Sequence, residues 1–216
     1  MTKPEWQQFL EFAPHYFSYV TSCRQRGQPS LLARILGVYS VGGAGVGVLV
    51  MEHVWYECGA APRYDLKGTA RGRAPPPPAP TSAPNAAAPP TDPDVLLDDN
   101  LLALRWERPL WVRGHTARVL WAALARDTRF LADSCVMDYS LLLGLRGGTL
   151  VLGIIDYIRT FTWDKKLEHL VKKNLGSGQP TVVSPEEYRR RFGRACRKYF
   201  LQCPGPWDHL YDTTHP

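Results

Sequence analysis

The sequence predicts an α+β fold, and three stretches in its second half are the basis of that prediction. The stretch 139–155 holds two apolar, β-prone runs on either side of a Gly-Gly turn, which is typical of a β-hairpin. Residues 116–131 have apolar side chains at helical spacing, as in an amphipathic helix. Ser184 is followed by a proline and, at the third position, by a glutamate. This is a capping signature, so we expect a helix over residues 185–203.

The first hundred residues contain weaker patterns. Residues 5–20 have apolar residues at helical spacing but include Pro14, so one broken helix or two short helices are expected. Two strands are expected to follow, over residues 32–41 and 46–56, and a glycine-rich turn joins them. Residues 95–104 are expected to form one further short element.

The glycine-rich run from Gly42 to Gly47 invites interpretation as a phosphate-binding loop, but its context argues against that interpretation. A P-loop ends in Gly-Lys-Ser/Thr and opens a helix, whereas this run leads into the strand-like Val48-Leu49-Val50. A dinucleotide fingerprint also requires a following helix, and a kinase glycine loop requires a strand lysine soon after it. We therefore interpret the run as a hairpin turn.

Composition restricts the kind of protein and its partners. The 216 residues are 44% hydrophobic, which is typical of a globular protein, and the net charge of +6 suggests an anionic partner. The excess is local, because residues 159–198 contain eleven Lys or Arg and four Asp or Glu. Residues 74–93 include nine of the nineteen prolines, so we expect them to form a disordered insertion.

The cysteines and the hydropathy pattern predict a cytoplasmic protein. The five cysteines are scattered without a CxxC pair, which is typical of reduced thiols rather than of a disulfide framework or a zinc site. The first twenty residues lack a signal-peptide pattern. No apolar run reaches the roughly 18–20 residues that span a bilayer. We therefore expect a protein that is not secreted, has no transmembrane segment and touches membranes from outside.

Two aspartates, Asp138 and Asp156, bracket the predicted hairpin. Their midpoint is residue 147, in the turn itself, so folding the chain there would place both carboxylates at the open end, on neighbouring strands roughly 5 Å apart. Like charges at that distance repel unless a cation, a shared proton or water relieves them. Mg²⁺ carrying a phosphate is one such cation. Two solvated aspartates at strand ends are the alternative, and on spacing alone they are the more common arrangement.

The helix expected over residues 185–203 has two different faces. Its apolar stripe, which we expect to pack on the core, consists of Tyr188, Phe192, Cys196 and Tyr199. Its arginines and Lys198 lie on the other faces, where they are either solvated or bind phosphate directly. No nucleic-acid motif accompanies them, so nucleic acid is not expected as a partner.

Three motifs are too specific to result from composition. They are Met137-Asp138-Tyr139-Ser140-Leu141-Leu142, the run from Ile154 through Asp156 to Lys166, and Asp65-Leu66-Lys67-Gly68-Thr69. Together they resemble the phosphatidylinositol phosphate kinases, and most closely the endosomal branch that acts on phosphatidylinositol 3-phosphate. The resemblance runs from about residue 5 to residue 210, except for the proline-rich insertion. It implies the C-terminal lobe and the end of the N-terminal lobe of a fold related to protein kinases.

The resemblance implies a role for each motif. Asp138 would orient or deprotonate the inositol hydroxyl, and Asp156 would hold Mg²⁺ against the phosphates of ATP. Asp65 and Lys67 would belong to the nucleotide-binding set, with Lys67 near the phosphates; taken alone, Lys67 could equally be a surface turn residue. Leu143 departs from the protein-kinase pattern, which has a metal-binding Asn five residues after the catalytic Asp.

The segment 157–184 resembles the activation or specificity loop of the same family. Its basic residues are interleaved with aromatic ones, a combination that suits an anionic membrane surface. The resemblance implies that this loop binds the phosphoinositide headgroup. The residues expected to make these contacts are Arg159, Lys165, Lys166, Lys172 and Lys173.

The resemblance predicts a lipid kinase at endosomal membranes that transfers the γ-phosphate of ATP to the 5-hydroxyl of phosphatidylinositol 3-phosphate. Residues 1–56 would be a remnant of the N-terminal lobe up to the hinge, and residues 57–216 the C-terminal lobe. No glycine-rich loop or strand lysine precedes them, so we expect an incomplete catalytic domain, inactive by itself, whose upstream regions bind protein scaffolds. The alternative is a non-catalytic fragment that binds phosphoinositide membranes or has a regulatory role.

Overall fold

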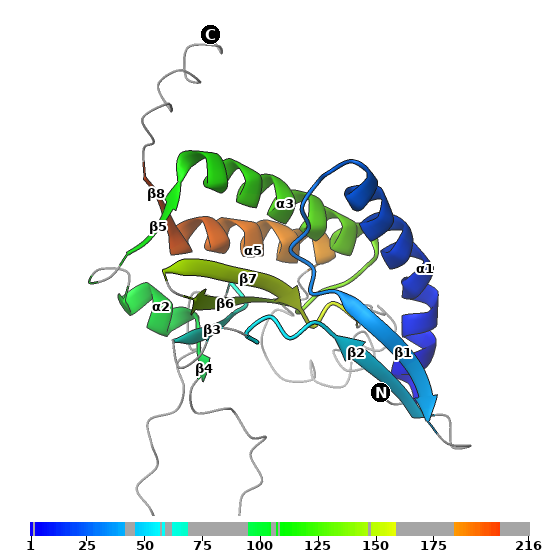
Figure 1. The fold of residues 1–216 in the computed structure, drawn as a ribbon. Helices are drawn as coiled ribbons and strands as arrows, with labels where there is room; N and C mark the ends of the chain where they lie inside the picture. Colours follow the sequence, from blue (N-terminus) through cyan, green and yellow to red (C-terminus); the bar gives the residue numbers. More distant parts are fainter. Residues whose placement is uncertain are drawn as a thin grey trace, which may run out of the picture.

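The predicted hairpin lies at the centre of the fold (Figure 1). It consists of β6 (Ser140–Arg146) and β7 (Thr149–Ile155), which pair antiparallel. Two shorter strands, β3 (Arg63–Leu66) and β4 (Val95–Leu96), extend the sheet in the order β4-β3-β6-β7. The computed structural model describes residues 1, 3–41, 46–56, 58, 62–68, 95–104, 107, 109–146, 148–158 and 184–203. Helices and sheets both occur among them, so the predicted α+β class is confirmed.

Two long helices, α3 (Gly114–Asp133) and α5 (Pro185–Tyr199), pack against each other beside this sheet. Helix α3 is two residues longer at each end than the predicted stretch. The apolar stripe of α5 is buried, as its spacing predicts, and its members are Tyr188, Phe192, Cys196 and Tyr199.

The prediction that the last helix continues to residue 203 is wrong, because α5 ends at Tyr199. The backbone of Phe200 is extended, with φ −116° and ψ 139°, and its side chain is buried. Residues Phe200–Cys203 form β8, which pairs in parallel with β5 (Leu110–Arg113) directly before α3. This second sheet joins the start of α3 to the end of α5, so the two helices run antiparallel.

Helix α1 (Lys3–Gln25) is continuous, so the predicted break at Pro14 is wrong. A proline inside a helix removes one amide donor and crowds the carbonyl one turn earlier, here that of Leu10. Both Pro14 and Leu10 are exposed, so the proline lies on the solvent-facing side of the helix. The helix is held instead by Phe12 and Tyr16, which flank the proline and are each 2% exposed.

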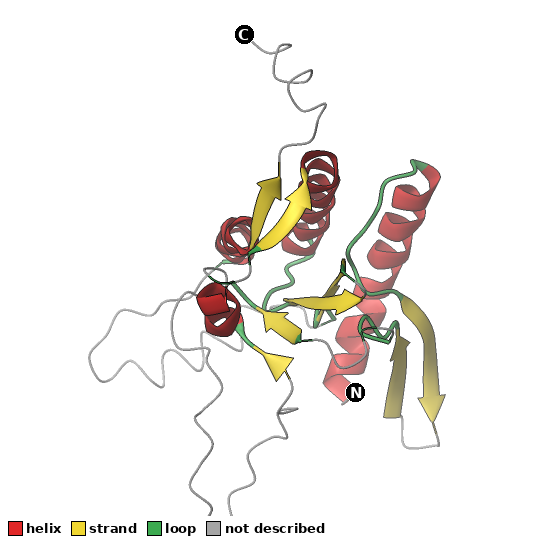
Figure 2. Ribbon diagram, turned by 60° about the vertical axis from the view of Figure 1, so that its left-hand side comes forward, coloured by secondary structure: helices red, strands yellow, loops and turns green. Residues whose placement is uncertain are grey.

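Strands β1 (Ile35–Val41) and β2 (Val46–Met51) form a separate two-stranded sheet beside α1 (Figure 2). They are shorter than the predicted runs 32–41 and 46–56, and the predicted turn at residues 42–45 lies outside the described residues. Gly47 allows the close approach to α1, since a Cβ there would lie 2.0 Å from the ring of Trp6.

The stretch 95–104, predicted as one short element, contains both β4 and a seven-residue helix, α2 (Asp98–Leu104). The proline-rich insertion predicted at residues 74–93 lies outside the described residues. No helix in the described part of the chain is long and apolar enough to span a bilayer.

A single core cluster joins α1, the central sheet and the helices α3 and α5, and tyrosines are prominent in it. Five of its tyrosines are among the largest fully buried side chains, namely Tyr16, Tyr64, Tyr139, Tyr157 and Tyr188. A buried hydroxyl needs a partner, and several of these fix loops. The Tyr16 hydroxyl accepts a hydrogen bond from the Ile35 amide at 3.0 Å, and Tyr157 donates to the carbonyl of Ala33.

A buried aspartate, Asp127 on α3, fixes α1 and the loop that follows it. Its carboxyl oxygens accept hydrogen bonds from the Tyr19 hydroxyl at 2.5 Å, the Ser30 hydroxyl at 3.0 Å and the Leu31 amide at 2.5 Å. Burial raises the pKa of Asp127, while these three donors oppose the increase. The loop that carries Ala33 is thereby attached to α3.

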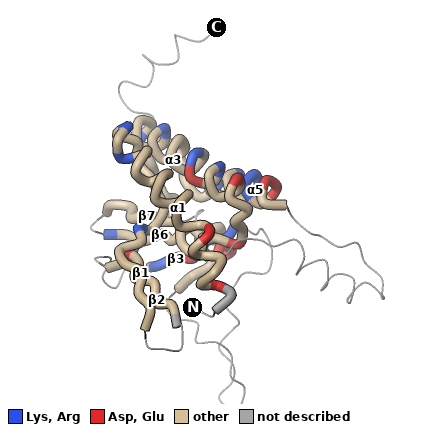
Figure 3. The backbone as a smooth tube through the Cα atoms, turned by 90° about the vertical axis from the view of Figure 1, so that its right-hand side faces the viewer, with Lys and Arg blue, Asp and Glu red and all other residues tan. Residues whose placement is uncertain are grey.

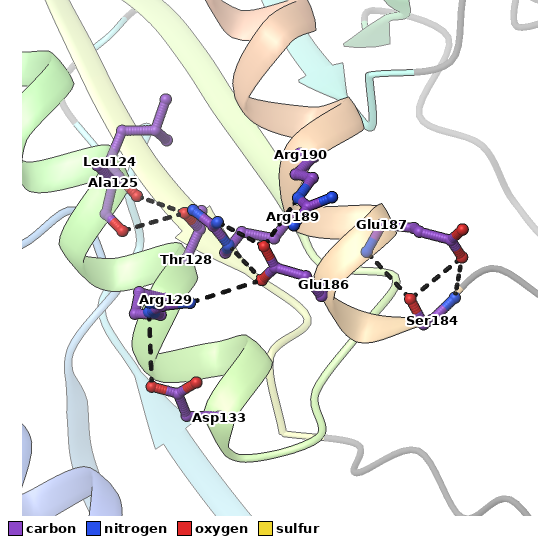
Figure 4. A network of polar contacts seen from close by, with 10 residues as sticks. All are labelled: Leu124, Ala125, Thr128, Arg129, Asp133, Ser184, Glu186, Glu187, Arg189 and Arg190. Carbon is purple, nitrogen blue, oxygen red and sulfur yellow. Dashed lines mark hydrogen bonds and ion pairs between the residues drawn. The ribbon is translucent and has the colours of Figure 1, made fainter.

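The predicted capping box at the start of α5 is confirmed (Figure 4). The Ser184 hydroxyl accepts a hydrogen bond from the Glu187 amide at 3.2 Å, and the Glu187 carboxylate accepts one from the Ser184 amide at 2.8 Å. We expect Ser184→Ala to lower the free energy of unfolding by about 1 kcal/mol, because a helix donor loses its acceptor.

Urea denaturation of the purified chain would measure this change. Ser18→Ala, which alters an exposed serine inside α1, is the matched control and should stay within about 0.5 kcal/mol of the wild type. Equal effects of the two substitutions would mean that the capping box does not stabilise α5.

Candidate active site

One residue from each of the three sequence motifs lies at the same end of the central sheet. Strand β3 is antiparallel to β6, and β6 is antiparallel to β7. The end of β3, the start of β6 and the end of β7 therefore lie at the same end of the sheet. Lys67 follows β3, Asp138 lies two residues before β6, and Asp156 follows β7 directly. The fold thus places residues from three separate sequence motifs at one end of the sheet.

The exact pairing of the hairpin differs from the prediction. A turn centred on residue 147 would place Asp138 directly opposite Asp156, but the strands pair Ser140 with Ile155 and Arg146 with Thr149. Continued by one step, this register brings Tyr139 opposite Asp156. The prediction of directly opposed aspartates is therefore wrong by one residue, because the turn contains two residues, 147 and 148, rather than being centred on one.

Both aspartates have an unusual backbone conformation. Asp138 and Asp156 each have φ 62°, in the left-handed region, which aspartate tolerates better than most residues but which still has an energetic cost. The chain is not extended at either residue, so their side chains do not follow the alternation of the strands. Both side chains are exposed. Strained residues of this kind are concentrated at functional sites, and the surrounding structure must hold them in place.

A fully buried tyrosine follows each aspartate and holds it. The ring of Tyr139 lies 4.8 Å from that of Tyr188 and 4.9 Å from that of Phe192, both on α5. Its carbonyl accepts a hydrogen bond from the Tyr188 hydroxyl at 2.5 Å. The ring of Tyr157 stacks on Tyr16 of α1 at 5.7 Å. Asp138 is therefore positioned by α5 and Asp156 by α1.

These two tyrosines are structural rather than acid–base groups. Burial raises the pKa of the Tyr139 hydroxyl far above its usual value, and it does the same for Tyr157. Both hydroxyls therefore stay neutral at any physiological pH. Of the groups described at this end of the sheet, Asp138 and Asp156 are the exposed ones that can take part in proton or metal chemistry.

Asp98, a buried residue at the start of α2 that no sequence motif indicates, positions the turn with Lys67. It is 0% exposed. Its Oδ2 accepts a hydrogen bond from the Lys67 amide at 3.2 Å, and its Oδ1 accepts from the Gly68 amide at 2.8 Å and from the Tyr199 hydroxyl at 2.5 Å. One side chain thus ties the Lys67 turn to both α2 and α5.

Gly68 makes this arrangement possible. Its φ of 71° favours glycine, and a Cβ there would lie 3.1 Å from both the Phe192 Cα and the Ala195 Cβ. The turn therefore packs directly on the backbone of α5. The glycine of the Asp65-Leu66-Lys67-Gly68 motif is therefore required by packing on α5, whatever role Lys67 has in binding phosphate.

Asp65 lies on β3 opposite Leu142, one step into the sheet from the end that carries Lys67. Leu142 in turn pairs with Gly153 on β7, so these three residues share one face. Val54 and Cys58, which lie between β2 and β3, contact the same face. A Cβ on Gly153 would lie 2.6 Å from a methyl group of Val54, and one on Gly144 would lie 2.7 Å from the Cys58 sulfur. Asp65 is thus on the face of the sheet that Val54 and Cys58, from the connection between β2 and β3, also contact.

The two aspartates suit a divalent cation that is also bound by a ligand. Carboxylate oxygens are the protein ligands that Mg²⁺ prefers, and this ion usually takes one or two of them and completes its shell with phosphates and water. Groups of three or more His, Cys, Asp or Glu side chains able to hold a metal do not occur in the described ranges. Leu143 is 0% exposed in β6, so it contributes nothing to such a site.

The predicted lipid-binding residues cannot be placed in this arrangement. Arg159, Lys165, Lys166, Lys172 and Lys173 lie outside the described residues. These residues belong to the stretch 159–183. The described residues on either side of it are Ile158, two positions after Asp156, and Ser184, the N-cap of α5. The segment therefore leaves the sheet next to Asp156 and returns at the helix that holds Tyr139.

Comparison with known proteins identifies relatives over nearly the whole chain. A family model described as phosphatidylinositol-4-phosphate 5-kinase matches residues 1–150 and 146–199. The chain is 44% identical over 224 residues to human 1-phosphatidylinositol 3-phosphate 5-kinase, which covers 97% of this chain and 10% of the relative. Identity is 44% over 223 residues to a putative Drosophila melanogaster 1-phosphatidylinositol 3-phosphate 5-kinase (94% of this chain, 11% of the relative). Identity is 38% over 224 residues to 1-phosphatidylinositol 3-phosphate 5-kinase FAB1 of Saccharomyces cerevisiae (96% of this chain, 9% of the relative). The chain spans about a tenth of the length of these relatives.

Proposed function

This chain belongs to the phosphatidylinositol-4-phosphate 5-kinase family, and on that premise we propose that it transfers the γ-phosphate of ATP to the 5-hydroxyl of phosphatidylinositol 3-phosphate. The observation that carries the proposal is the sheet end at which Lys67, Asp138 and Asp156 meet. The choice of lipid follows the names of the relatives, which are 1-phosphatidylinositol 3-phosphate 5-kinases. In this proposal, the sheet end binds the phosphates of ATP, a metal ion and the lipid hydroxyl that accepts the phosphate next to one another.

Each residue has a distinct role in this proposal. Asp156 holds Mg²⁺, which when bound neutralises the charge that develops on the transferred phosphate. Asp138 accepts the proton of the inositol 5-hydroxyl, or a hydrogen bond from it, and so directs its oxygen at the γ-phosphate. Lys67 is a cation near the phosphates, and Asp65 belongs to the nucleotide side of the site. In the kinase template that these roles follow, positioning and charge neutralisation do most of the catalysis.

The same proposal divides the chain at the connection between β2 and β3. Residues 1–56 are the end of the N-terminal lobe and residues 57–216 the C-terminal lobe, with the hinge at the segment that packs on Gly144 and Gly153. The position of this segment, on the face of the sheet that carries Asp65, supports a nucleotide between the hinge and the sheet end.

A chimera tests the proposed reaction. This chain would replace the matching segment of the human relative, and the product would be measured with radiolabelled ATP and vesicles that contain phosphatidylinositol 3-phosphate. We expect ATP-dependent formation of the 3,5-bisphosphate, and less product from vesicles with phosphatidylinositol 4-phosphate or unphosphorylated phosphatidylinositol. A folded chimera that consumes no ATP with any of these lipids would contradict the proposal.

The loop after Asp156 is proposed to bind the headgroup at the surface of endosomal membranes. Each Lys near an anionic membrane contributes about 1 kcal/mol. Replacing Lys165 and Lys166 together by alanine should therefore weaken binding of the chain to vesicles with phosphatidylinositol 3-phosphate by about 30-fold. Vesicle sedimentation at 0.1 M salt would measure the change.

Two exposed arginines, Arg24 in the last turn of α1 and Arg26 just after it, provide the matched control. Replacing both by alanine removes the same charge from a surface that is not proposed to face the membrane. If both double variants lose the same affinity, the binding reflects net charge alone and the loop has no special role.

A further inference from the structure

A shallow groove runs between α3 and α5 and has no part in the candidate active site. Its volume is about 500 Å³. Apolar groups form its floor, with Leu124 and Ala125 from α3 and Gly193 from α5. None of the residues assigned to the phosphoryl-transfer site lines it.

Arginines from α5 line the groove. Arg190, Arg194 and Arg197 are spaced four and three residues apart, which places them on one face of the helix. This face is opposite to the buried stripe that holds Tyr139, so a ligand in the groove would not compete with the core. Figure 3 shows the Lys and Arg segments gathered along α3 and α5.

The charge is balanced at one end of the groove only. At the start of α5, the Glu186 carboxylate accepts hydrogen bonds from Arg189 at 2.6 Å and from Arg190 at 2.9 Å, and it lies 3.8 Å from Arg129 of α3 (Figure 4). Arg189 and Arg190 lower the pKa of Glu186 to about 2. One and two turns further along, Arg194 and Arg197 form no ion pair with any described residue.

The cationic end is also held in place. The Arg197 guanidinium carbon lies 5.1 Å from the centre of the Trp121 ring on α3, a cation–π contact that orders the side chain. A Cβ added to Gly193 would meet nothing within 4 Å. The backbone of α5 is therefore open beside the two arginines, and there is room for a side chain from another molecule.

We propose that this groove docks an acidic segment of another protein. An apolar side chain of that segment occupies the floor over Leu124, Ala125 and Gly193, and its carboxylates pair with Arg194 and Arg197. Arginine binds carboxylates through two parallel hydrogen bonds, and segments with apolar anchors commonly bind in grooves between helices. A flat membrane surface would leave the concave floor unfilled, so a protein segment fits this shape better.

An array of synthetic 15-residue peptides provides the probe. Each peptide carries one Leu or Trp and up to four Glu in varied register, and a matched array carries Gln in place of Glu. We expect the 216-residue chain to bind members of the acidic array and not their Gln counterparts. The double variant Arg194→Ala, Arg197→Ala should weaken binding of the selected peptides by at least about 10-fold.

Gly193→Leu tests the floor of the groove independently of charge, and it should weaken binding by a similar factor. Arg24→Ala, which removes an exposed charge from α1, should leave it unchanged. Circular dichroism would verify that every variant is folded. The proposal is wrong if no acidic peptide binds, if Gln peptides bind equally well, or if the variants bind like the wild type. It is also wrong if the double variant Arg194→Ala, Arg197→Ala loses binding to phosphatidylserine vesicles and binds the acidic peptides like the wild type.

Discussion

Replacing Asp156 by asparagine in the chimera is expected to lower lipid phosphorylation by roughly 1,000-fold or more, because the metal ligand loses its charge. Asparagine has the size of aspartate and tolerates the left-handed region, so it suits the φ of 62° at this position. Tyr157 should still anchor the chain on Tyr16. The loss of activity would then report on the carboxylate and not on the fold.

The measurement is the initial rate of product formation at several Mg²⁺ concentrations. Asp133→Asn, which alters an exposed aspartate at the end of α3, is the matched control and should keep the wild-type rate. A variant at position 156 that retains more than a tenth of the activity would contradict the assignment of this residue to the metal. In that case Asp138 would be the first alternative to test.

The candidate site was predictable in outline because its parts are local patterns. The two apolar runs and the Gly-Gly turn predict the hairpin, and the hairpin alone places Asp138 and Asp156 at one end. The register was not predictable from the midpoint, since two- and three-residue turns fit the same sequence and shift the pairing by one. The left-handed backbone at both aspartates depends on Tyr139 and Tyr157 being buried against α5 and α1, which are distant in sequence.

The helices also show that local patterns are predictable from the sequence and that features set by distant contacts are not. The capping box at Ser184 predicts the start of α5 correctly, because all its parts lie within four residues. Its end at Tyr199 depends on the pairing of Phe200 with Leu110, ninety positions earlier in the chain. Pro14 has a strong local tendency to break α1, and the burial of Phe12 and Tyr16 overrides it.

Asp98 is the clearest residue that sequence reasoning could not identify. An aspartate in the first turn of a helix is ordinary, and Asp99 next to it has the same local signal. What distinguishes Asp98 is its burial and its three donors from the Lys67 turn and from α5. Those donors come from segments 30 and 101 positions away, so only the fold brings them together.

Asp98→Ala is therefore expected to lower the free energy of unfolding of the chain by roughly 3–5 kcal/mol, since three hydrogen bonds lose their acceptor inside the protein. Asp99→Ala is the matched control, and it should change stability by less than about 0.5 kcal/mol because no described group depends on it. Urea denaturation, monitored by tryptophan fluorescence, would compare the stability of the two variants. In the chimera, a conservative variant, Tyr199→Phe, removes one of the three donors and should cost about 1 kcal/mol of stability.

The Asp98 variants also separate structure from catalysis. Because Asp98 holds the backbone of Lys67 and Gly68, a loosened turn should raise the KM for ATP in the Tyr199→Phe chimera while the KM for lipid stays unchanged. An unchanged KM for ATP together with the expected loss of stability would mean that the buried aspartate supports the fold alone, and that the turn with Lys67 does not bind the phosphates. A loss of stability below about 1 kcal/mol for Asp98→Ala would contradict the assignment of this residue as the anchor of the turn.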